Sequence, residues 1–322
     1  MSSGRKLGIV LGAGVGRGWA HIGVLQALAE LGVKPDIVCG CSIGALVGAS
    51  YVTGHLDALA NLATSLTRRR VLSYMDVSFA GGGLIEGRWI VQFFADNVQD
   101  TSIEGTIPTF GAVATELYTG RETWLTSGSI IDAVRASIAI PGLFTPIQLQ
   151  GKWLVDGALV NPLPVSLCRA LGADVILGVS MSGDVGNRPQ RLLTEPSVKP
   201  SQNTGQSEWL RWLGYGLPPG VTVDGSQAMK TNIRSEHDRP SYIEVVGESF
   251  FIIQDFVSRV RLAADPVDLL IAPKVAHIGV MEFYRAEEAI EAGRKAVMSI
   301  QDAILRATAK SEPGAAEATK PT

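Results

Sequence analysis

The stretch Gly40-Cys41-Ser42-Ile43-Gly44 has the residue types and spacing to attack an acyl group. It lies between an apolar run typical of a buried strand, Asp36–Cys39, and one typical of a helix, Ala45–Val52. A GxSxG sequence between a strand and a helix is a nucleophile elbow, in which glycines allow a sharp turn and the serine hydroxyl is presented at its tip. The N-terminus of the following helix would also favour an oxyanion nearby. An ordinary strand-to-helix turn is the alternative interpretation of these five residues alone.

A glycine-rich loop, Gly12–Gly18, follows a predicted strand at Lys6–Leu11 and precedes a predicted helix at Trp19–Leu31. Because glycine has no Cβ, several backbone N–H groups of such a loop can converge on a developing negative charge. A nucleotide site is the alternative, but the dinucleotide fingerprint needs a glycine where Arg17 stands, and the lysine of the Walker pattern is missing. We therefore favour an anion cradle.

A carboxylate, Asp156, follows a short predicted strand at Lys152–Val155 and precedes Gly157. A strand end is where a catalytic carboxylate would be presented at the rim of a sheet, although Asp-Gly is also a common turn. Among the histidines, His277 occupies the place where an α/β-hydrolase triad would have its base. That fold, however, carries its nucleophile after several strands, whereas Ser42 follows what reads as the second strand. The other histidines are His21, in a helix interior where packing or hydrogen bonding is usual, His55 and His237.

Composition excludes several other classes of protein. The chain has 322 residues, is 46% hydrophobic and carries a formal net charge of −3, which supports a large core and gives no electrostatic basis for binding nucleic acid. The cysteines Cys39, Cys41 and Cys168 have neither zinc-type nor CxxC spacing, so we expect no disulfide framework, no metal site and a reducing compartment. The apolar run Leu7–Leu11 is too short for a signal peptide. No run approaches the ~18 apolar residues of a membrane-spanning helix.

Strands and helices alternate along the chain in βαβ order, which predicts an α/β fold with a parallel sheet. The segment 54–107 is predicted to be mainly helical. Within it, Arg68-Arg69-Arg70 is predicted to be the solvated end of a helix or, alternatively, a membrane-surface contact. Further strands are predicted at Thr109–Tyr118, Glu122–Leu125, Val175–Met181 and Val267–Ile271, and further helices at Ser129–Ile138, Pro164–Leu171, Tyr242–Leu262 and Arg285–Leu305.

Taken together, the loop Gly12–Gly18, the elbow Gly40–Gly44 and Asp156-Gly157-Ala158 resemble the three signatures of the patatin-like phospholipases, in the same order. The likeness extends to Trp19–Leu25 and Ala136–Gly142. It covers roughly residues 6–181, and the segment Arg261–Gly279 is similar to bacterial members related to the esterase domain of neuropathy target esterase. The resemblance implies a patatin-like three-layer sandwich with a mostly parallel central sheet and a nucleophile elbow.

The resemblance also implies a Ser-Asp dyad with no histidine in the proton relay and no cofactor. Ser42 would be the nucleophile and Asp156 the general base, and the reaction would pass through an acyl-enzyme. Backbone N–H groups of Ala13, Gly14 and Val15 would form the oxyanion hole, although family loops commonly carry a glycine at the place of Ala13. The motif glycines are Gly12, Gly16, Gly18, Gly40, Gly44 and Gly157, and candidates to line an acyl pocket are Phe79, Leu84, Trp89, Phe93 and Phe94.

The expected function is therefore a serine hydrolase that cleaves acyl esters of lipids, as a lysophospholipase, phospholipase A or carboxylesterase. The alternatives are a non-catalytic lipid-binding or regulatory adaptor on the same fold, and an α/β-hydrolase with a Ser-His-Asp triad. The expected partner is a lipid or acyl-ester substrate. We expect the protein to be cytoplasmic, and peripheral contact with the inner membrane surface is left open. We expect a catalytic core at 1–181, an irregular insertion at 182–240 whose aromatic part, 205–220, could form a lid or membrane patch, a C-terminal completion of the same domain at 241–307, and a disordered tail at 308–322.

Overall fold

The computed structural model describes residues 5–70, 93, 101–182, 242–279 and 281–309. The chain divides into two units, Met1–Arg188 with Ile243–Thr322, and Pro189–Tyr242. Apart from Tyr242, the structure described below belongs to the first unit. The predicted insertion at 182–240 and tail at 308–322 lie almost entirely outside the described residues, so those predictions stay untested.

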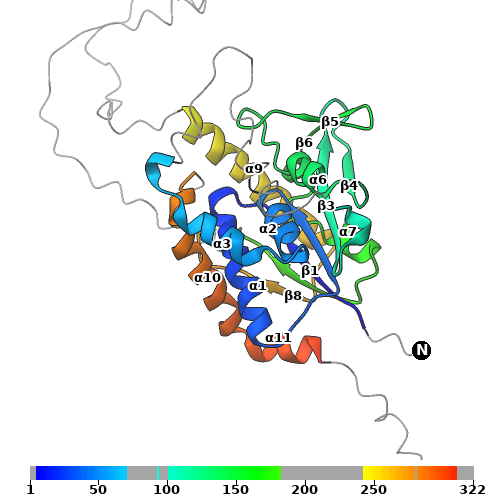
Figure 1. The fold of residues 1–322 in the computed structure, drawn as a ribbon, viewed down its shortest axis with the longest axis vertical. Coiled ribbons are helices and arrows are strands. Elements are labelled where there is room, and N and C mark those ends of the chain that lie inside the picture. Colours follow the sequence, from blue (N-terminus) through cyan, green and yellow to red (C-terminus); the bar gives the residue numbers. More distant parts are fainter. Residues whose placement is uncertain (1–4, 71–92, 94–100, 183–241, 280, 310–322) are drawn as a thin grey trace, which may run out of the picture. The chain divides into compact units, whose positions relative to one another are not determined.

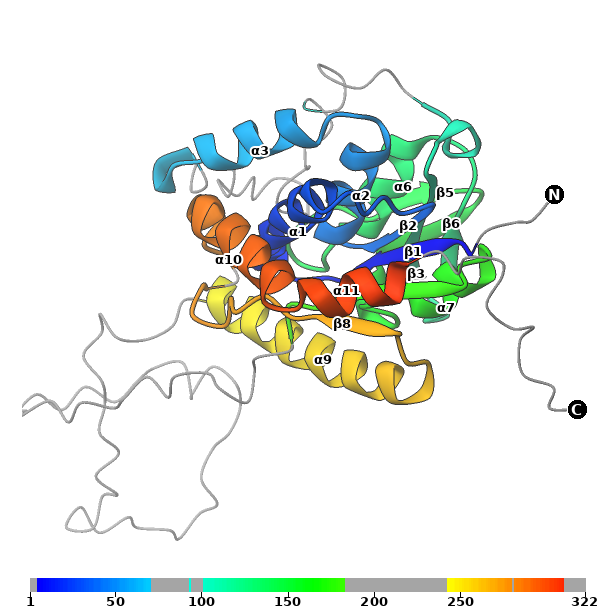
Figure 2. The same cartoon turned by 90° about the horizontal axis from the view of Figure 1, so that it is seen from below.

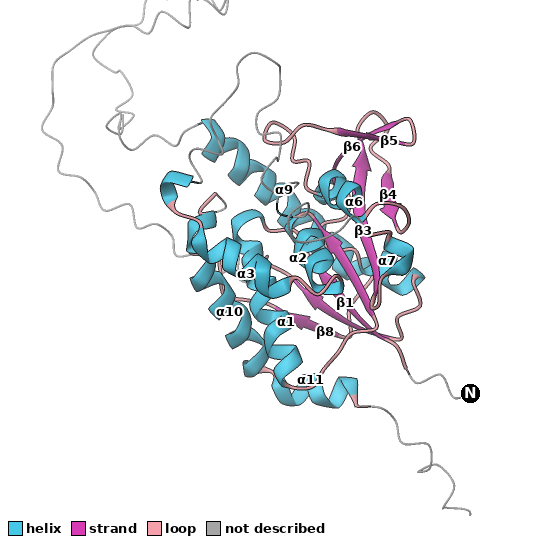
Figure 3. Ribbon diagram, viewed as in Figure 1, coloured by secondary structure: helices cyan, strands magenta, loops and turns pink. Residues whose placement is uncertain are grey.

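A single mixed sheet forms the centre of the described part of the chain (Figures 1 and 3). Its strands follow the order β5-β6-β3-β2-β1-β7-β8, and β4 pairs separately with β3. Neighbours from β3 through β8 are parallel, whereas β4, β5 and β6 form antiparallel pairs. The α/β fold with a mostly parallel sheet is confirmed. The strands are β1 (Leu7–Leu11), β2 (Ile37–Cys41), β3 (Thr109–Glu116), β4 (Glu122–Leu125), β5 (Ile147–Leu149), β6 (Lys152–Asp156), β7 (Val175–Val179) and β8 (Leu269–Ile271).

Helices cover both faces of this sheet, as Figure 2 shows, so the unit has three layers. Side chains alternate along each strand because successive residues of a strand point to opposite faces. In β1, Ile9 and Leu11 join the core beneath α1, α2 and α10, whereas Val10 joins the core beneath α7 and the end of α9. The helices are α1 (Ala20–Glu30), α2 (Ile43–Val52), α3 (Leu56–Ser65), α6 (Ile130–Ser137), α7 (Val165–Ala170), α9 (Tyr242–Ala264), α10 (Ala286–Ser299) and α11 (Gln301–Thr308).

Helices α1 and α10 pack with their backbones almost in contact. A Cβ added to Gly23 would lie 1.8 Å from the carbonyl oxygen of Ile290, and one added to Gly293 would lie 2.0 Å from that of Ala20. Glycine at both positions therefore permits the close crossing. This crossing ties the C-terminal part of the chain to the helix that follows the glycine loop.

One predicted helix differs from the structure, and one strand is missing from the prediction. The single helix expected at Arg285–Leu305 is two helices, because Ile300 leaves the helical region with φ −128° and ψ 20°. No glycine or proline marks this break in the sequence. The short strand β5 was not predicted at all. No described helix is long and apolar enough to span a membrane.

Candidate active site

Ser42 is the single residue between β2 and α2, and its backbone conformation is strained. Its φ of 56° and ψ of −127° are rare for a residue that has a side chain. A Cβ at Gly40 would lie 2.5 Å from the nitrogen of Ala45, and one at Gly44 would lie 2.1 Å from the carbonyl oxygen of Leu11. The turn therefore has the geometry of a nucleophile elbow, and both motif glycines are sterically required.

Strand β3 brings the elbow next to Asp156. In the parallel pair, β2 reaches Cys41 opposite Val113, and in the antiparallel pair β6 reaches Asp156 opposite Ala114. Strand β4 pairs with residues 112–115 of β3, which overlap both the residues paired with β2 and those paired with β6. Because a strand has only two edges, β4 occupies one edge of β3, and β2 and β6 share the other. Strands β2 and β6 therefore run toward each other along one edge of β3, and their carboxyl ends meet.

The side chains of Ser42 and Asp156 are in direct hydrogen-bond contact. The Ser42 hydroxyl donates to Oδ2 of Asp156 at 2.6 Å, and the Ala158 N–H donates to Oδ1 at 2.8 Å. The main chain of Asp156 is also held, because its N–H donates to the Ala139 carbonyl and its carbonyl accepts the Thr115 hydroxyl. Ser42 is only 2% exposed and Asp156 is fully buried. The carboxyl group is thus fixed in place and shielded from water.

Burial changes the acidity of this carboxyl group. Loss of solvation raises the pKa of Asp156 to about 7, although hydrogen bonds from Ser42 and Ala158 act in the opposite direction. A carboxyl group with a pKa near neutrality can both accept a proton from a hydroxyl and return it to a leaving group.

Ser137, at the end of α6, holds the backbone of the elbow in place. Its hydroxyl oxygen accepts the Ser42 N–H at 2.9 Å, and the hydroxyl donates to the Val113 carbonyl at 2.7 Å. The same side chain therefore joins the nucleophile's backbone to the strand that aligns β2 and β6. The sequence offered no role for Ser137; the only signal was its place within Ala136–Gly142, one of the flanks that resemble the family.

Replacing Ser137 with alanine is expected to lower both stability and turnover. The buried Ser42 N–H would lose its acceptor, which costs about 1–3 kcal/mol of unfolding free energy. A displaced nucleophile should cost on the order of 10²-fold in kcat for an ester substrate. The matched control is Ser50→Ala, since the equally buried Ser50 hydroxyl donates only to Leu46 within α2. Equal effects of the two substitutions in calorimetry and kinetics would contradict a supporting role for Ser137.

The glycine loop directs its backbone N–H groups in different directions. The N–H of Ala13 donates to the Pro162 carbonyl at 2.8 Å, so this predicted oxyanion donor is already engaged in the fold. The N–H groups of Gly14 and Val15 donate to no acceptor within the described residues. Val15 also has a φ of 50°, a left-handed conformation that is rare for a β-branched residue. The candidate oxyanion donors therefore narrow to Gly14 and Val15.

His21 anchors the start of this loop and is fully buried. Its Nε2 lies 2.7 Å from the Gly12 carbonyl oxygen, and since a carbonyl only accepts, the ring must carry its proton on Nε2. Burial lowers the pKa of His21 to about 4, which keeps the ring neutral at physiological pH. This histidine orients the loop, and its hydrogen bond goes to Gly12, not to Ser42.

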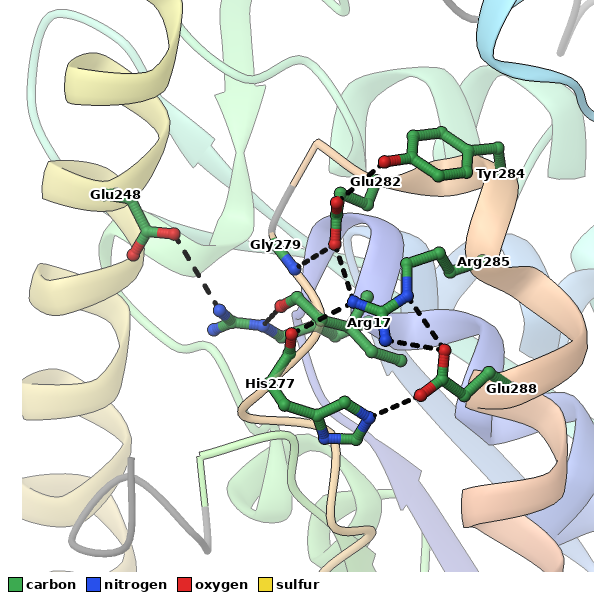
Figure 4. Close-up of polar contacts among 9 residues, drawn as sticks. Arg17, Glu248, His277, Gly279, Glu282, Tyr284, Arg285 and Glu288 are labelled. Carbon is green, nitrogen blue, oxygen red and sulfur yellow. Dashed lines mark hydrogen bonds and ion pairs between the residues drawn. The ribbon is translucent and has the colours of Figure 1, made fainter. Parts of the chain in front are cut away.

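The histidine proposed for a triad, His277, lies in a surface network. Its Nε2 is 2.7 Å from Glu288, whose other carboxylate oxygen accepts from Arg285 (Figure 4). Within the described residues, the Ser42 hydroxyl donates to Asp156 and to no histidine. His55 precedes α3, and His237 lies outside the described residues. The described part of the chain therefore gives no support to a Ser-His-Asp triad.

An apolar cluster includes residues close in sequence to both members of the dyad. Its members come from the glycine loop, from the residues near Ser42 and Asp156, from the segment after α6, and from α9. Of the predicted acyl-pocket residues, Phe93 is buried in the main core, while Phe79, Leu84, Trp89 and Phe94 lie outside the described residues. The described part of the chain holds no cluster of side chains suited to a metal ion. The buried members of the cluster are Ala13, Val15, Cys41, Ile140, Ala158, Phe250 and Phe251.

A strained serine elbow on a mostly parallel sheet, with a glycine loop beside it, defines a class of α/β serine hydrolases. The patatin-like phospholipase family profile matches residues 9–169, and the chain belongs to this family. An uncharacterized NTE family protein of Mycobacterium tuberculosis is 32% identical over 334 residues, which cover 91% of this chain and 90% of that protein.

Two other likenesses cover less of this chain. Lysophospholipase nte1 of Emericella nidulans is 36% identical over 197 residues, which cover 58% of this chain but only 12% of that protein. Among solved structures, VipD from Legionella pneumophila matches with a TM-score of 0.32 and 15% identity, covering 55% of this chain and 50% of that one.

Proposed function

We propose that this chain is a serine hydrolase that cleaves acyl esters of lipids, as a lysophospholipase, phospholipase A or carboxylesterase. The observation that carries the proposal is the 2.6 Å hydrogen bond from the Ser42 hydroxyl to the buried Asp156 carboxylate. Membership of a phospholipase family supports lipid esters as the substrate class. The apolar cluster that includes Cys41 and Ala158 suits an acyl chain better than it suits a polar group.

The geometry supports the following reaction. As the Ser42 oxygen attacks the ester carbonyl carbon, its proton moves to Oδ2 of Asp156, and the carbonyl oxygen becomes an oxyanion. The N–H groups of Gly14 and Val15 would stabilise that oxyanion, together with the N-terminus of α2. Asp156 then returns the proton to the departing alcohol, which leaves an acyl-enzyme on Ser42. Asp156 next takes a proton from a water molecule as that water attacks the acyl carbon, and it passes the proton to the Ser42 oxygen as the C–O bond of the acyl-enzyme breaks. The fatty acid is released and the dyad is restored.

A fluorophosphonate probe tests the nucleophile directly. We expect the probe to label the wild-type chain at Ser42 in the folded state and to leave Ser42→Ala unlabelled. Ser50→Ala is the matched control, because it removes a buried hydroxyl from α2, the helix that follows Ser42, without touching the dyad. Folded wild-type protein that resists the probe and hydrolyses no p-nitrophenyl ester would instead favour a non-catalytic adaptor.

The pKa of Asp156 predicts the pH dependence of hydrolysis. The general base must be unprotonated, so kcat/KM should rise with pH through about 7 and then level off. Initial rates with a neutral p-nitrophenyl ester across this range give the profile. A rising limb near 3.8, the ordinary value for an aspartate, would show that burial does not control the base.

A further inference from the structure

A segment near the C-terminus holds the side chain of Arg17, which lies in the glycine loop. We call residues 275–279 and 281–285 the C-terminal segment; they lie outside residues 9–169, which the family profile matches. The Nε atom of Arg17 donates to the Ile278 carbonyl at 2.5 Å, across a separation of 261 residues in the sequence. Arg17 is only 3% exposed and Ile278 is fully buried, so this hydrogen bond forms away from water.

The backbone of Arg17 holds the peptide group that carries a candidate oxyanion donor. The Arg17 N–H donates to the Gly14 carbonyl at 3.1 Å. That carbonyl belongs to the same peptide group as the Val15 N–H, and in a planar trans peptide the two point in opposite directions. Fixing the direction of the Gly14 carbonyl therefore fixes the direction of the Val15 N–H. A displacement of Arg17 would turn this donor.

The conformation of Val15 needs such support. Its φ of 50° is strained for a β-branched residue, and a strained backbone persists only where the surrounding structure holds it. Val15 belongs to the apolar cluster that includes Phe251, and the guanidinium carbon of Arg17 lies 4.2 Å from the centre of the Phe251 ring. Arg17 therefore supports Val15 both through its backbone and through a member of that cluster.

The C-terminal segment is itself held in shape by two of its side chains (Figure 4). Arg285 donates to the His277 carbonyl at 3.0 Å and to a carboxylate oxygen of Glu282 at 2.9 Å. The same carboxylate oxygen accepts the Gly279 N–H at 2.8 Å. The residues on both sides of Ile278 are therefore fixed by Arg285 and Glu282, which sets where the Ile278 carbonyl lies.

A second hydrogen bond joins the C-terminal segment to Trp19, two residues after Arg17. The indole N–H of Trp19 donates to the Phe283 carbonyl at 3.2 Å, and the two rings meet edge to face with centroids 6.4 Å apart. Trp19 is fully buried. Hydrogen bonds to two different carbonyls restrict rotation of the loop about either one of them.

We propose that Arg17 and the C-terminal segment position an oxyanion donor. Arg285 and Glu282 place the Ile278 carbonyl, this carbonyl places Arg17, and Arg17 directs the Val15 N–H. Arg17 is thus a positioning residue, because it acts through the backbone of the loop. The inference rests on the proposed function, since an oxyanion forms only if Ser42 attacks an acyl carbon.

Two substitutions test the two ends of this series of contacts. Arg17→Met removes the donor to Ile278 and keeps an unbranched side chain next to Phe251. The ion-pair partner of Arg17, Glu248 at 3.8 Å, is 41% exposed, so its charge stays solvated in this variant. Arg285→Met changes a side chain of the C-terminal segment and leaves the loop and the dyad as they are.

Arg294→Met is the matched control. The Arg294 side chain is 33% exposed and that of Arg285 is 27% exposed. Arg294 forms an ion pair between α10 and Glu30 of α1 at 2.7 Å. This control therefore also removes an arginine that ties the C-terminal part of the chain to the N-terminal part, but at a distance from the glycine loop in the sequence.

The measurement compares turnover of a p-nitrophenyl ester with binding of a trifluoromethyl ketone, which adds to a serine and forms an oxyanion as the transition state does. We expect Arg17→Met to lower kcat about 10²-fold with KM unchanged, and to raise the Ki of the ketone by the same factor. Arg285→Met should show the same pattern with a loss on the order of tenfold. Arg294→Met should match the wild type. The rising limb of the pH profile near 7 should not move, because Asp156 is unchanged.

The ketone separates positioning from a purely structural role. A variant that is partly unfolded has a lower kcat, but its folded molecules bind the ketone with the wild-type Ki. A lower kcat with an unchanged Ki would therefore overturn the proposal. If Arg17→Met does not fold, Arg285→Met decides alone, and a Ki equal to that of Arg294→Met would overturn the proposal.

The double variant Arg17→Met/Arg285→Met tests the order of the contacts. Because Arg285 acts through Arg17, the double variant should be about as slow as Arg17→Met alone. Losses that multiply would show that Arg285 acts by another route and would overturn the link.

Failure of the proposed function gives a different result. Wild-type protein that neither hydrolyses the ester nor binds the ketone would overturn the esterase, and the positioning role with it. Wild-type protein that does both, with an unchanged Ki in Arg17→Met and Arg285→Met, would overturn the positioning role alone.

Discussion

Asp156→Asn is expected to reduce kcat/KM for carboxylic esters by about 10²–10⁴-fold, the usual contribution of a general base. Asparagine has nearly the same shape as aspartate. Its oxygen can still accept the Ala158 N–H, and its amide can donate to the Ser42 oxygen, so both contacts of the carboxylate are replaced. The amide cannot take up a proton at neutral pH, and the chemical step should fail in an otherwise intact site.

The stability of Asp156→Asn shows whether a loss of activity comes from the chemical step or from unfolding. Because the folded-state pKa of Asp156 is raised from 3.8 to about 7, its stabilising contribution is fully present below pH 3.8, falls as pH rises from there, and is lost once pH passes about 7. Above that pH the wild type buries a charge that Asp156→Asn lacks. The variant should therefore unfold at the same temperature as the wild type or higher at pH 8. Asp132→Asn, on the exposed side of α6, is the control for both measurements. Wild-type turnover in Asp156→Asn would remove the dyad from the mechanism.

Gly293→Ala is expected to destabilise the fold by about 1–3 kcal/mol, because the added methyl group must push two helices apart. Its Cβ would lie 2.0 Å from the Ala20 carbonyl oxygen, a backbone atom that cannot rotate away. In an open helix the same substitution would stabilise by about 0.5–1 kcal/mol, since alanine restricts the unfolded chain. The expected change in the free energy of unfolding is therefore opposite in sign to the change that helix propensity alone predicts.

Chemical denaturation of the full chain measures this effect. Lys295→Ala, at a position of α10 whose side chain is 75% exposed, should change stability by no more than about 0.5 kcal/mol. If Gly293→Ala proved as stable as the wild type, α1 and α10 would not pack as closely as the structure shows.

Features set by a short window of sequence could be predicted. The βαβ unit at the start of the chain and the elbow at Ser42 each depend on neighbouring residues, and α9 was predicted within two residues of its end at Ala264. Its outward side could not be predicted, because that depends on packing against the glycine loop and the segment after Asp156. A pattern of apolar residues does not say which of them meet solvent.

Features set by strand pairing across long separations could not be predicted from the residues themselves. Ser42 and Asp156 are 114 residues apart, and only the family resemblance linked them. The role of Ser137 depends on the distance from α6 to the elbow, which no local pattern encodes. The engagement of Ala13 with Pro162 likewise arises from a contact between distant loops. These contacts reduce the candidate oxyanion donors to Gly14 and Val15, and they identify Ser137 as a residue that supports the elbow.

The meeting of β2 and β6 on one edge of β3 makes the proposed catalysis depend on strand register. Side chains of a strand alternate between faces, so a one-residue slip of β6 along β3 would turn Asp156 to the opposite face of the sheet. Such a slip would leave the glycine loop, the elbow and the Asp-Gly pair unchanged in the sequence. Relatives that keep all three signatures but insert one residue within Ala112–Thr115 should therefore be inactive. The register of β6 on β3 is therefore a requirement of the proposed dyad in addition to the three motifs.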